Sequence, residues 1–137
     1  MIWAVLDTNT LVSGFGWPDG PPGQIVERAL RGRFLIVTSR ALMAELADVL
    51  QRPKLAAVVS EPLALVLLIE TASVLVEPVL RLSVVPDDPD NRVLEASQAG
   101  HADYIVTGDG GLLELDTFDG ASIVQPSDFL QILDSGS

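Results

Sequence analysis

Two apolar, strand-like runs in this chain each end in an aspartate. The first run, residues 2–6, is followed by Asp7, and the second, residues 104–108, is followed by Asp109. In an open parallel α/β sheet, ligands bind outside the carboxyl ends of the strands. Two carboxylates brought to that edge from segments about a hundred residues apart would form one negative site. Such a site favours a bound cation.

Further acids occur at positions from which they could join this site. Glu45 lies at the border of the apolar stripe of a helix predicted over 40–52, where it could line a cleft or simply face solvent. Asp87, Asp88 and Asp90 share one turn at a predicted helix start, where free amides and the helix dipole favour acids in any protein. Asp88 is the expected N-cap of that helix. Asp90 would project from the first helical turn toward the sheet edge.

Carboxylates held together without a cation repel one another, and some become protonated near neutral pH. Mg²⁺ or Mn²⁺ relieves this repulsion and prefers oxygen ligands. A metal held by acids can activate water and stabilise a phosphoryl transition state. The chain has no cysteine, and His101 is its only histidine, which excludes sites built from several histidines or thiolates.

The composition fits one domain over residues 1–137, with nearly half of the residues hydrophobic. The formal net charge is −11, from 19 acids and 8 bases. Nucleic-acid-binding domains are usually basic, so either the chain avoids polyanions or metal ions mediate the contact. The acidity also favours a basic partner protein.

The longest apolar run, residues 63–69, has seven residues, whereas a membrane span needs about 20. Met1 leads directly into a predicted core strand, without a signal peptide. We therefore expect a soluble cytoplasmic protein with no membrane partner.

Strands alternate with helices along the chain, which predicts βαβ units and a mainly parallel sheet. A Gly/Pro loop is expected over 14–23. Asp103 precedes a strand and should lie at the opposite end of the sheet from Asp109. The expected strands are 2–6, 34–37, 73–77, 103–107 and 121–124, and the expected helices are about 23–31, 40–52, 62–72, 89–100 and a short one from 127 or 128.

The segment from Met1 to Gly14 resembles the opening of the PIN-domain ribonucleases. The segments 39–50, 87–96 and 102–109 are similar to the second, third and fourth motifs of that family. The similarity covers nearly the whole chain and keeps the order of the motifs. It is closest to the toxin subgroup related to VapC-type toxins of toxin–antitoxin pairs.

This resemblance implies a three-layer α/β/α sandwich around a parallel sheet of four or five strands. It implies Mg²⁺- or Mn²⁺-dependent endonucleolytic cleavage of RNA, a small antitoxin that blocks the cleft, and a homodimer. It also implies roles for matching positions. The metal-binding and catalytic acids would be Asp7, Glu45, Asp90 and Asp109, with Asn9 and Thr107 supporting them by hydrogen bonding and Ser13 nearby.

One position departs from the subgroup pattern, because related toxins often carry a further acid where this chain has Asn91. That leaves Asp90 as the main acid of its turn, with Asp87 or Asp88 as helpers. An RNA-binding chain this acidic would also need arginines near the cleft. The candidates are Arg28, Arg31, Arg33, Arg40 and Arg52.

Two other functions stay open at this point. The run Asp7–Thr10 resembles the nucleophile motif of haloacid-dehalogenase-type phosphatases, although Asn9 stands where their acid/base aspartate belongs. A non-catalytic binding protein could keep the same fold. The absent auxiliary acid and the negative charge favour that alternative, and the retained acids oppose it.

Overall fold

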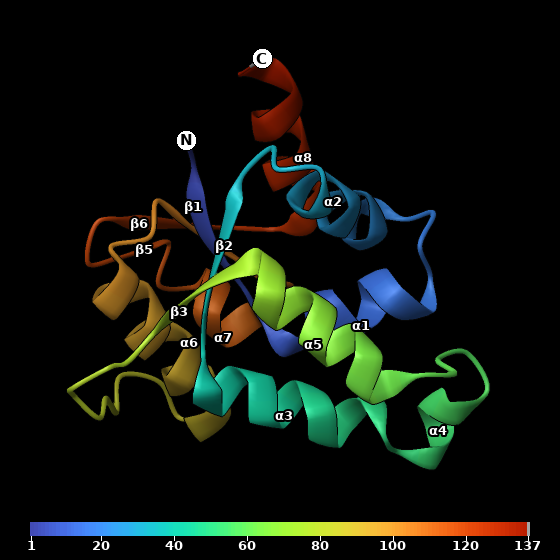
Figure 1. Cartoon of the computed structure of the whole chain (residues 1–137). Coiled ribbons are helices and arrows are strands. Elements are labelled where there is room, and N and C mark those ends of the chain that lie inside the picture. Colours follow the sequence, from blue (N-terminus) through green and yellow to red (C-terminus); the bar gives the residue numbers. More distant parts are fainter. Residues whose placement is uncertain (137) are drawn as a thin grey trace.

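One sheet forms the centre of the computed structural model, which describes residues 1–136 (Figure 1). In chain order its strands are β1 (Trp3–Leu6), β2 (Leu35–Ser39), β3 (Ser73–Val76), β4 (Tyr104–Val106), β5 (Thr117–Phe118) and β6 (Ala121–Val124). In space the order is β3-β2-β1-β4-β6-β5, and only the β5–β6 pair is antiparallel. β2 and β4 flank β1 on opposite sides, which makes the carboxyl end of β1 the kind of switch point where α/β sheets bind ligands.

Helices connect the strands. Over the described residues they are α1 (Thr8–Gly16), α2 (Pro21–Leu30), α3 (Arg40–Leu50), α4 (Pro53–Ala56), α5 (Pro62–Ala72), α6 (Asp88–Gly100), α7 (Gly110–Leu113) and α8 (Pro126–Ser135). Five of them, α2, α4, α5, α6 and α8, have proline in their first two positions. Proline is suited to these positions because a helix leaves its first amides unpaired.

The sheet separates two buried hydrophobic clusters, because successive side chains of a strand point to opposite faces. In β1, Ala4 and Leu6 belong to one cluster, and Val5 belongs to the other. Helices α1, α2, α5 and α8 pack on the first face, and α6 and α7 pack on the second, while α3 contributes to both. The predicted three-layer α/β/α sandwich is confirmed.

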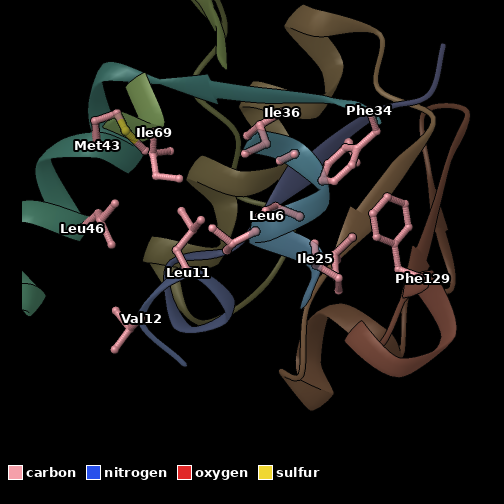
Figure 2. Packing of buried hydrophobic residues seen from close by; sticks show 14 of the residues in the cluster. Leu6, Leu11, Val12, Ile25, Phe34, Ile36, Met43, Leu46, Ile69 and Phe129 are labelled. Carbon is pink, nitrogen blue, oxygen red and sulfur yellow. The ribbon is translucent and has the colours of Figure 1, made fainter. Parts of the chain in front are cut away.

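Aromatic rings hold the C-terminal helix against the sheet. Phe129 of α8 meets the edge of Phe34 at a centroid distance of 5.1 Å (Figure 2). It also packs against Tyr104 of β4 at 5.5 Å. Both phenylalanines are almost fully buried. Aromatic pairs in such geometries add to the stability that burial alone provides.

The predicted loop over 14–23 is wrong at both ends, because α1 continues to Gly16 and α2 begins at Pro21. Gly14 serves close packing between α1 and α2. A Cβ at this position would lie 2.9 Å from Val26 Cγ2 and 3.0 Å from the carbonyl oxygen of Pro22. The glycine that suggested a loop is therefore a contact point between two helices.

Four elements were not predicted: α1, α4, α7 and the edge strand β5. The strand β5 makes the sheet one strand wider than expected. The predicted cap of α6 is also wrong by one residue, since Asp87 holds the N-cap position and Pro89 the second helical position. By contrast, α3, α5 and β6 lie within two residues of their predicted ranges. None of the helices in the described residues combines the length and the apolar character that a membrane crossing requires.

Candidate metal centre

An acidic cleft of about 230 Å³ opens at the carboxyl edge of β1 and β4. Its carboxylates come from four places in the chain: the end of β1, the middle of α3, the start of α6 and the end of β4. The acids that line it are Asp7, Glu45, Asp87, Asp90 and Asp109. The structure thus brings the four acids predicted from sequence into one cleft and adds Asp87 to them.

Asp7 lines the cleft and is only 5% exposed. Its Oδ1 accepts a hydrogen bond from the amide of Thr10 at 2.8 Å, which caps α1. Its Oδ2 accepts a hydrogen bond from the hydroxyl of Thr107. Asp7 therefore has a structural role as a helix cap while it also lines the cleft.

Asp109 is built in the same way at the end of the neighbouring strand. Its Oδ2 accepts a hydrogen bond from the amide of Leu112 at 3.0 Å and caps α7. Its own amide donates to Oγ1 of Thr107 at 3.0 Å. The buried hydroxyl of Thr107 thus connects the two aspartates, donating to one side chain and accepting from the backbone of the other.

Asp87, Asp90 and Asp109 each place a carboxylate oxygen within 4.8 Å of the other two. Oδ2 of Asp90 is buried, and no donor of the described residues reaches it. Burial raises the pKa of Asp90 to about 7, helped by a hydrogen bond with Asp109 and by the charges of Asp109, Asp87 and Asp7. A divalent cation would satisfy the unpaired oxygen and remove the repulsion, so this donor set fits a hard metal ion.

The remaining predicted residues differ in whether they line the acidic cleft. Glu45 is half-buried on α3 and lines the cleft without belonging to the group of three closest acids. Asn9 also lines the cleft and is exposed. Ser13 lies further along α1 and does not line the cleft. Asp103 accepts a hydrogen bond from the amide of Trp3 at 2.9 Å. That contact at the start of β1 confirms that Asp103 lies at the opposite edge of the sheet.

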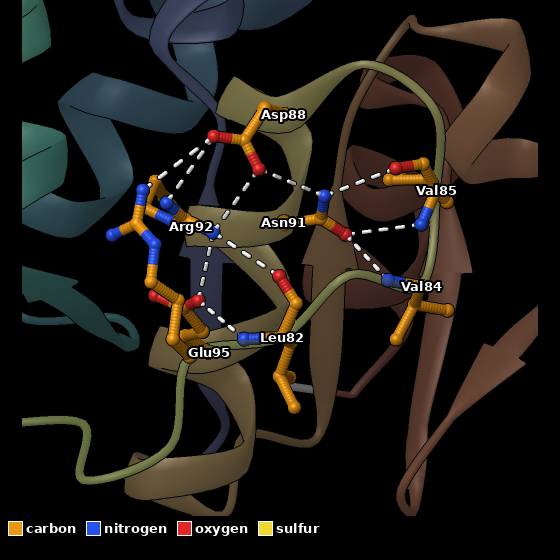
Figure 3. A network of polar contacts seen from close by, with 8 residues as sticks. Leu82, Val84, Val85, Asp88, Asn91, Arg92 and Glu95 are labelled. Atoms are coloured by element: carbon orange, nitrogen blue, oxygen red, sulfur yellow. Dashed lines mark hydrogen bonds and ion pairs between the residues drawn. The ribbon is translucent and has the colours of Figure 1, made fainter.

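Asn91 does not occupy the position of a missing metal ligand. Its side chain is buried, lies outside the lining of the cleft and points toward the loop between β3 and α6 (Figure 3). Its Oδ1 accepts from the amides of Val84 and Val85 at 2.9 and 3.0 Å. Its Nδ2 donates to the carbonyl of Val85 at 3.0 Å and to Oδ1 of Asp88 at 3.3 Å. These contacts commit the Asn91 side chain to the loop, so we expect an aspartate at this position to face the loop as well.

Two more side chains of α6 hold the same loop (Figure 3). Glu95 accepts a hydrogen bond from the amide of Leu82 at 2.8 Å and forms an ion pair with Arg92 at 2.9 Å. Arg92 donates to the carbonyl of Leu82 at 3.2 Å and pairs with Asp88 at 3.3 Å. The loop that leads to Asp87 is thus fastened to the helix that carries Asp90.

Sequence reasoning missed two features of this region. It treated Asp87 only as a helper, although Asp87 is one of the three acids that lie closest together. It also overlooked Arg81 and Arg92, which pair with Asp88 beside the cleft. The run of acids over residues 87–90 could have indicated Asp87 as a site residue. No local pattern of the chain indicates where the long loop before α6 places Arg81.

Comparison with known families agrees with this architecture. A family model described as a PIN domain matches residues 4–110. The chain belongs to the PIN-domain family. PIN domains are generally nucleases, and the matched range includes every acid that lines the cleft.

Similar proteins include one from Methanocaldococcus jannaschii named only as the uncharacterized protein MJ1680. It is 27% identical over 117 residues, which cover 83% of this chain and 75% of that protein. In the crystal structure of VapBC2 from Rickettsia felis bound to a DNA fragment from their promoter, the matching chain has a TM-score of 0.62 and 13% identity. The match covers 90% of this chain and 98% of that one.

PAE2754 from Pyrobaculum aerophilum gives a TM-score of 0.56 at 17% identity, over 98% of this chain and 90% of that one. These two structures show the same fold.

Proposed function

We propose that this PIN-domain protein is a metal-dependent endoribonuclease and the toxin of a toxin–antitoxin pair. The observation that carries the proposal is the unpaired, buried oxygen of Asp90 beside the carboxylates of Asp87 and Asp109. An arrangement of acids that raises one of their pKa values toward neutrality is costly for folding alone. It is explained by a function that requires a cation there.

The proposed reaction is hydrolysis of an RNA phosphodiester. Water adds to phosphorus, the bond to one ribose oxygen breaks, the proton of the water passes to a carboxylate of the cleft, and solvent protonates the leaving oxygen. Asp87, Asp90 and Asp109 would hold Mg²⁺ or Mn²⁺, with Asp7 and Glu45 completing the acidic lining. When bound, the cation would lower the pKa of the attacking water and neutralise charge on the phosphate.

The residues around the acids have supporting roles in this proposal. Thr107 fixes the orientation of Asp7 and the backbone of Asp109 through its hydroxyl. Asn9, exposed at the rim, is placed to donate a hydrogen bond to the RNA. Ser13 lies outside the cleft lining, so we assign it at most an indirect effect through α1.

The likeness to the VapBC2 structure supports a protein partner in this proposal. We propose a small antitoxin that covers the cleft, a homodimeric toxin and a cytoplasmic location, with residues 1–137 acting as one domain. A short reading frame that overlaps the start of this one, and relief of growth arrest when both are expressed together, would support the pair.

The direct test is cleavage of single-stranded RNA by the purified protein with Mg²⁺, Mn²⁺ or EDTA. We expect cleavage with either metal and none with EDTA. The Asp90→Asn variant should lose at least about 100-fold in rate, because it removes one charged ligand from the metal site. Mn²⁺ binding, measured by electron paramagnetic resonance, should weaken in the same variant.

Asp128→Asn is the matched control. Asp128 occupies the third position of α8, as Asp90 does in α6, but it is exposed and outside the cleft. This control should cut RNA at the wild-type rate. Equal cleavage by wild type and Asp90→Asn would indicate a contaminating nuclease. Mn²⁺ binding without any cleavage would favour the non-catalytic binding protein instead.

The phosphatase alternative has less support from the geometry. It needs Asp7 as a nucleophile and an acid two residues later, but that residue is the neutral, exposed Asn9. Both carboxylate oxygens of Asp7 also accept hydrogen bonds within the protein. Trapping of a covalent phosphate on Asp7 would restore this alternative.

A further inference from the structure

A second cavity lies beside the acidic cleft, over the carboxyl ends of β2 and β3. Its volume is about 340 Å³. Ser39 and Val76, which end these two strands and pair with each other, form part of its wall. We call it the arginine cavity, after the residues that give it its character. Its polar lining consists of Ser39, Arg40, Glu77, Arg81, Arg92 and Glu95.

Three of the eight basic residues of this acidic chain meet in the arginine cavity. Arg40 opens α3, Arg81 belongs to the loop before α6, and Arg92 comes from the first half of α6. The Nε atom of Arg92 is buried and has no hydrogen-bond acceptor among the described residues. The first turn of α3 adds the positive end of a helix dipole, because Arg40 and Ala41 hold its first two positions.

The carboxylates around the arginine cavity differ in how firmly they are paired with its arginines. Glu95 is buried and committed to Arg92 and to the amide of Leu82. Arg40 and Glu77 form a loose pair at 3.8 Å, with both side chains about 80% exposed. Arg81 pairs with Asp88 at 3.5 Å and is 74% exposed. Exposed pairs of this kind contribute little to stability, so Arg40 and Arg81 can turn to another anion at small cost.

Residues of the same two helices, α3 and α6, line both the arginine cavity and the acidic cleft. α3 lines the first with Arg40 and the second with Glu45, five residues or about 7.5 Å further along its axis. α6 lines the first with Arg92 and the second with Asp90 and Val93. A nucleic-acid strand that spans from one cavity to the other along these helices would contact both sites.

We propose that the arginine cavity binds a backbone phosphate of the RNA next to the one that is cut. This inference rests on the proposed ribonuclease function, and it explains how a chain of charge −11 can hold a polyanion. The acidic cleft would engage the scissile phosphate through a cation, and Arg40 and Arg81 would hold the neighbouring phosphate directly.

The test compares two double variants that lose the same charge. Arg40→Ala/Arg81→Ala removes the two exposed arginines of the proposed subsite and leaves Arg92 in place. Arg31→Ala/Arg33→Ala is the control, because both arginines are exposed at the end of α2, before β2 begins and therefore at the opposite edge of the sheet. Arg40→Lys/Arg81→Lys keeps the charge and should retain most of the binding. Circular dichroism checks that each variant is folded.

Binding is measured by fluorescence anisotropy with a labelled single-stranded oligoribonucleotide in Ca²⁺, with the RNA checked for integrity afterwards. We expect the alanine pair at the subsite to weaken binding about tenfold and to reduce the salt slope of log K by about 1.4, or about 0.7 for each arginine removed from the phosphate. The control pair should change neither. With Mg²⁺, KM for the oligonucleotide should rise while kcat and the cleavage of a dinucleotide stay unchanged.

The outcomes separate this inference from the proposed function. If the wild type cleaves RNA and the Arg40 and Arg81 substitutions do not weaken RNA binding, the subsite is overturned and the ribonuclease proposal is retained. RNA binding that depends on these arginines, without cleavage in any metal, supports the subsite and overturns the ribonuclease. Inorganic phosphate that binds calorimetrically through Arg40 and Arg81, with RNA binding unaffected, would assign the arginine cavity to a free anion and overturn the inference.

Discussion

At the scale of single residues, Thr107 is the centre of the site. It is fully buried, and its hydroxyl joins the side chain of Asp7 to the backbone of Asp109. A Thr107→Val change keeps the shape and removes both hydrogen bonds. We expect a loss of roughly 1–3 kcal/mol in the free energy of unfolding, because a buried carboxylate oxygen loses its donor.

Urea denaturation measures this loss, and Mn²⁺ titration should show weaker metal binding in the same variant. Thr107→Ser, which keeps the hydroxyl, is the control and should stay close to wild type. Equal stability of the valine variant and wild type would show that the hydroxyl does not organise the site.

The raised pKa of Asp90, about 7, makes the metal-free protein sensitive to pH. Between about pH 4 and pH 7 the folded protein keeps a proton that the unfolded chain has lost, so stability falls as the pH rises through this window. Asp90→Asn removes the penalty. Because Asp90 is partly exposed, solvent screening limits the gain to roughly 1 kcal/mol above pH 7.

Urea denaturation in EDTA at pH values from 4 to 8 tests this prediction. The variant and wild type should differ least at pH 4 and most at pH 8. A difference that does not vary with pH would mean that Asp90 titrates normally.

Asn91→Asp tests whether this position can supply a metal ligand. The new carboxylate would still accept from the amides of Val84 and Val85, but it would lose the donor to the Val85 carbonyl and face Asp88. We expect a loss of roughly 1–3 kcal/mol in the free energy of unfolding and no additional bound Mn²⁺. A gain in bound metal would show that the side chain can turn into the cleft.

At the scale of elements, the packing of α1 against α2 depends on Gly14. A Cβ there would meet Val26 Cγ2 and the Pro22 carbonyl at 2.9 and 3.0 Å. Gly14→Ala should therefore destabilise the protein by about 1–3 kcal/mol through overpacking, although alanine is the better helix former. Gly16→Ala is the matched control in the same helix, since its Cβ would lie at an ordinary 3.6 Å from Val58. Thermal unfolding should separate the two variants, and equal melting temperatures would contradict this account of Gly14.

The longer elements could be predicted from sequence because their patterns are local. Buried strands such as β1 and β6 are short apolar runs, and α3 has an apolar stripe with a serine cap. α1 was missed because its glycine pattern reflects close packing against α2, which depends on tertiary structure. α7 and β5 have four and two residues, and their formation depends on the cap from Asp109 and on pairing with β6.

At the scale of the whole molecule, the site could be predicted only in part. The two strand ends located Asp7 and Asp109, and the helix start suggested Asp90. The positions of Arg40, Arg81 and Arg92 around one cavity could not be read from the chain, because three separate elements must first fold to bring them together. Of the arginines predicted near the cleft, Arg52 lines it. Arg28 instead pairs with Asp134 of α8 at 3.0 Å, away from the cleft.

The charge of −11 has a consequence for overall stability. Repulsion among the acids opposes the compact state and is screened by salt. We expect moderate sodium chloride to raise the melting temperature of the metal-free protein by a few degrees, which corresponds to about 1 kcal/mol. Differential scanning fluorimetry in EDTA, with increasing sodium chloride, measures this. A melting temperature that falls with salt would show that its ion pairs matter more than its net charge.

Asp7 and Asp109 cap helices as well as lining the cleft, so losing either one damages the fold. Asp90, in contrast, makes the apo protein less stable. A descendant of this protein that no longer cut RNA would therefore be under pressure to keep Asp7 and Asp109 and free to replace Asp90. In a genome survey, Asp7 and Asp109 would then indicate a folded PIN domain, and Asp90 would indicate one that retains RNA cleavage.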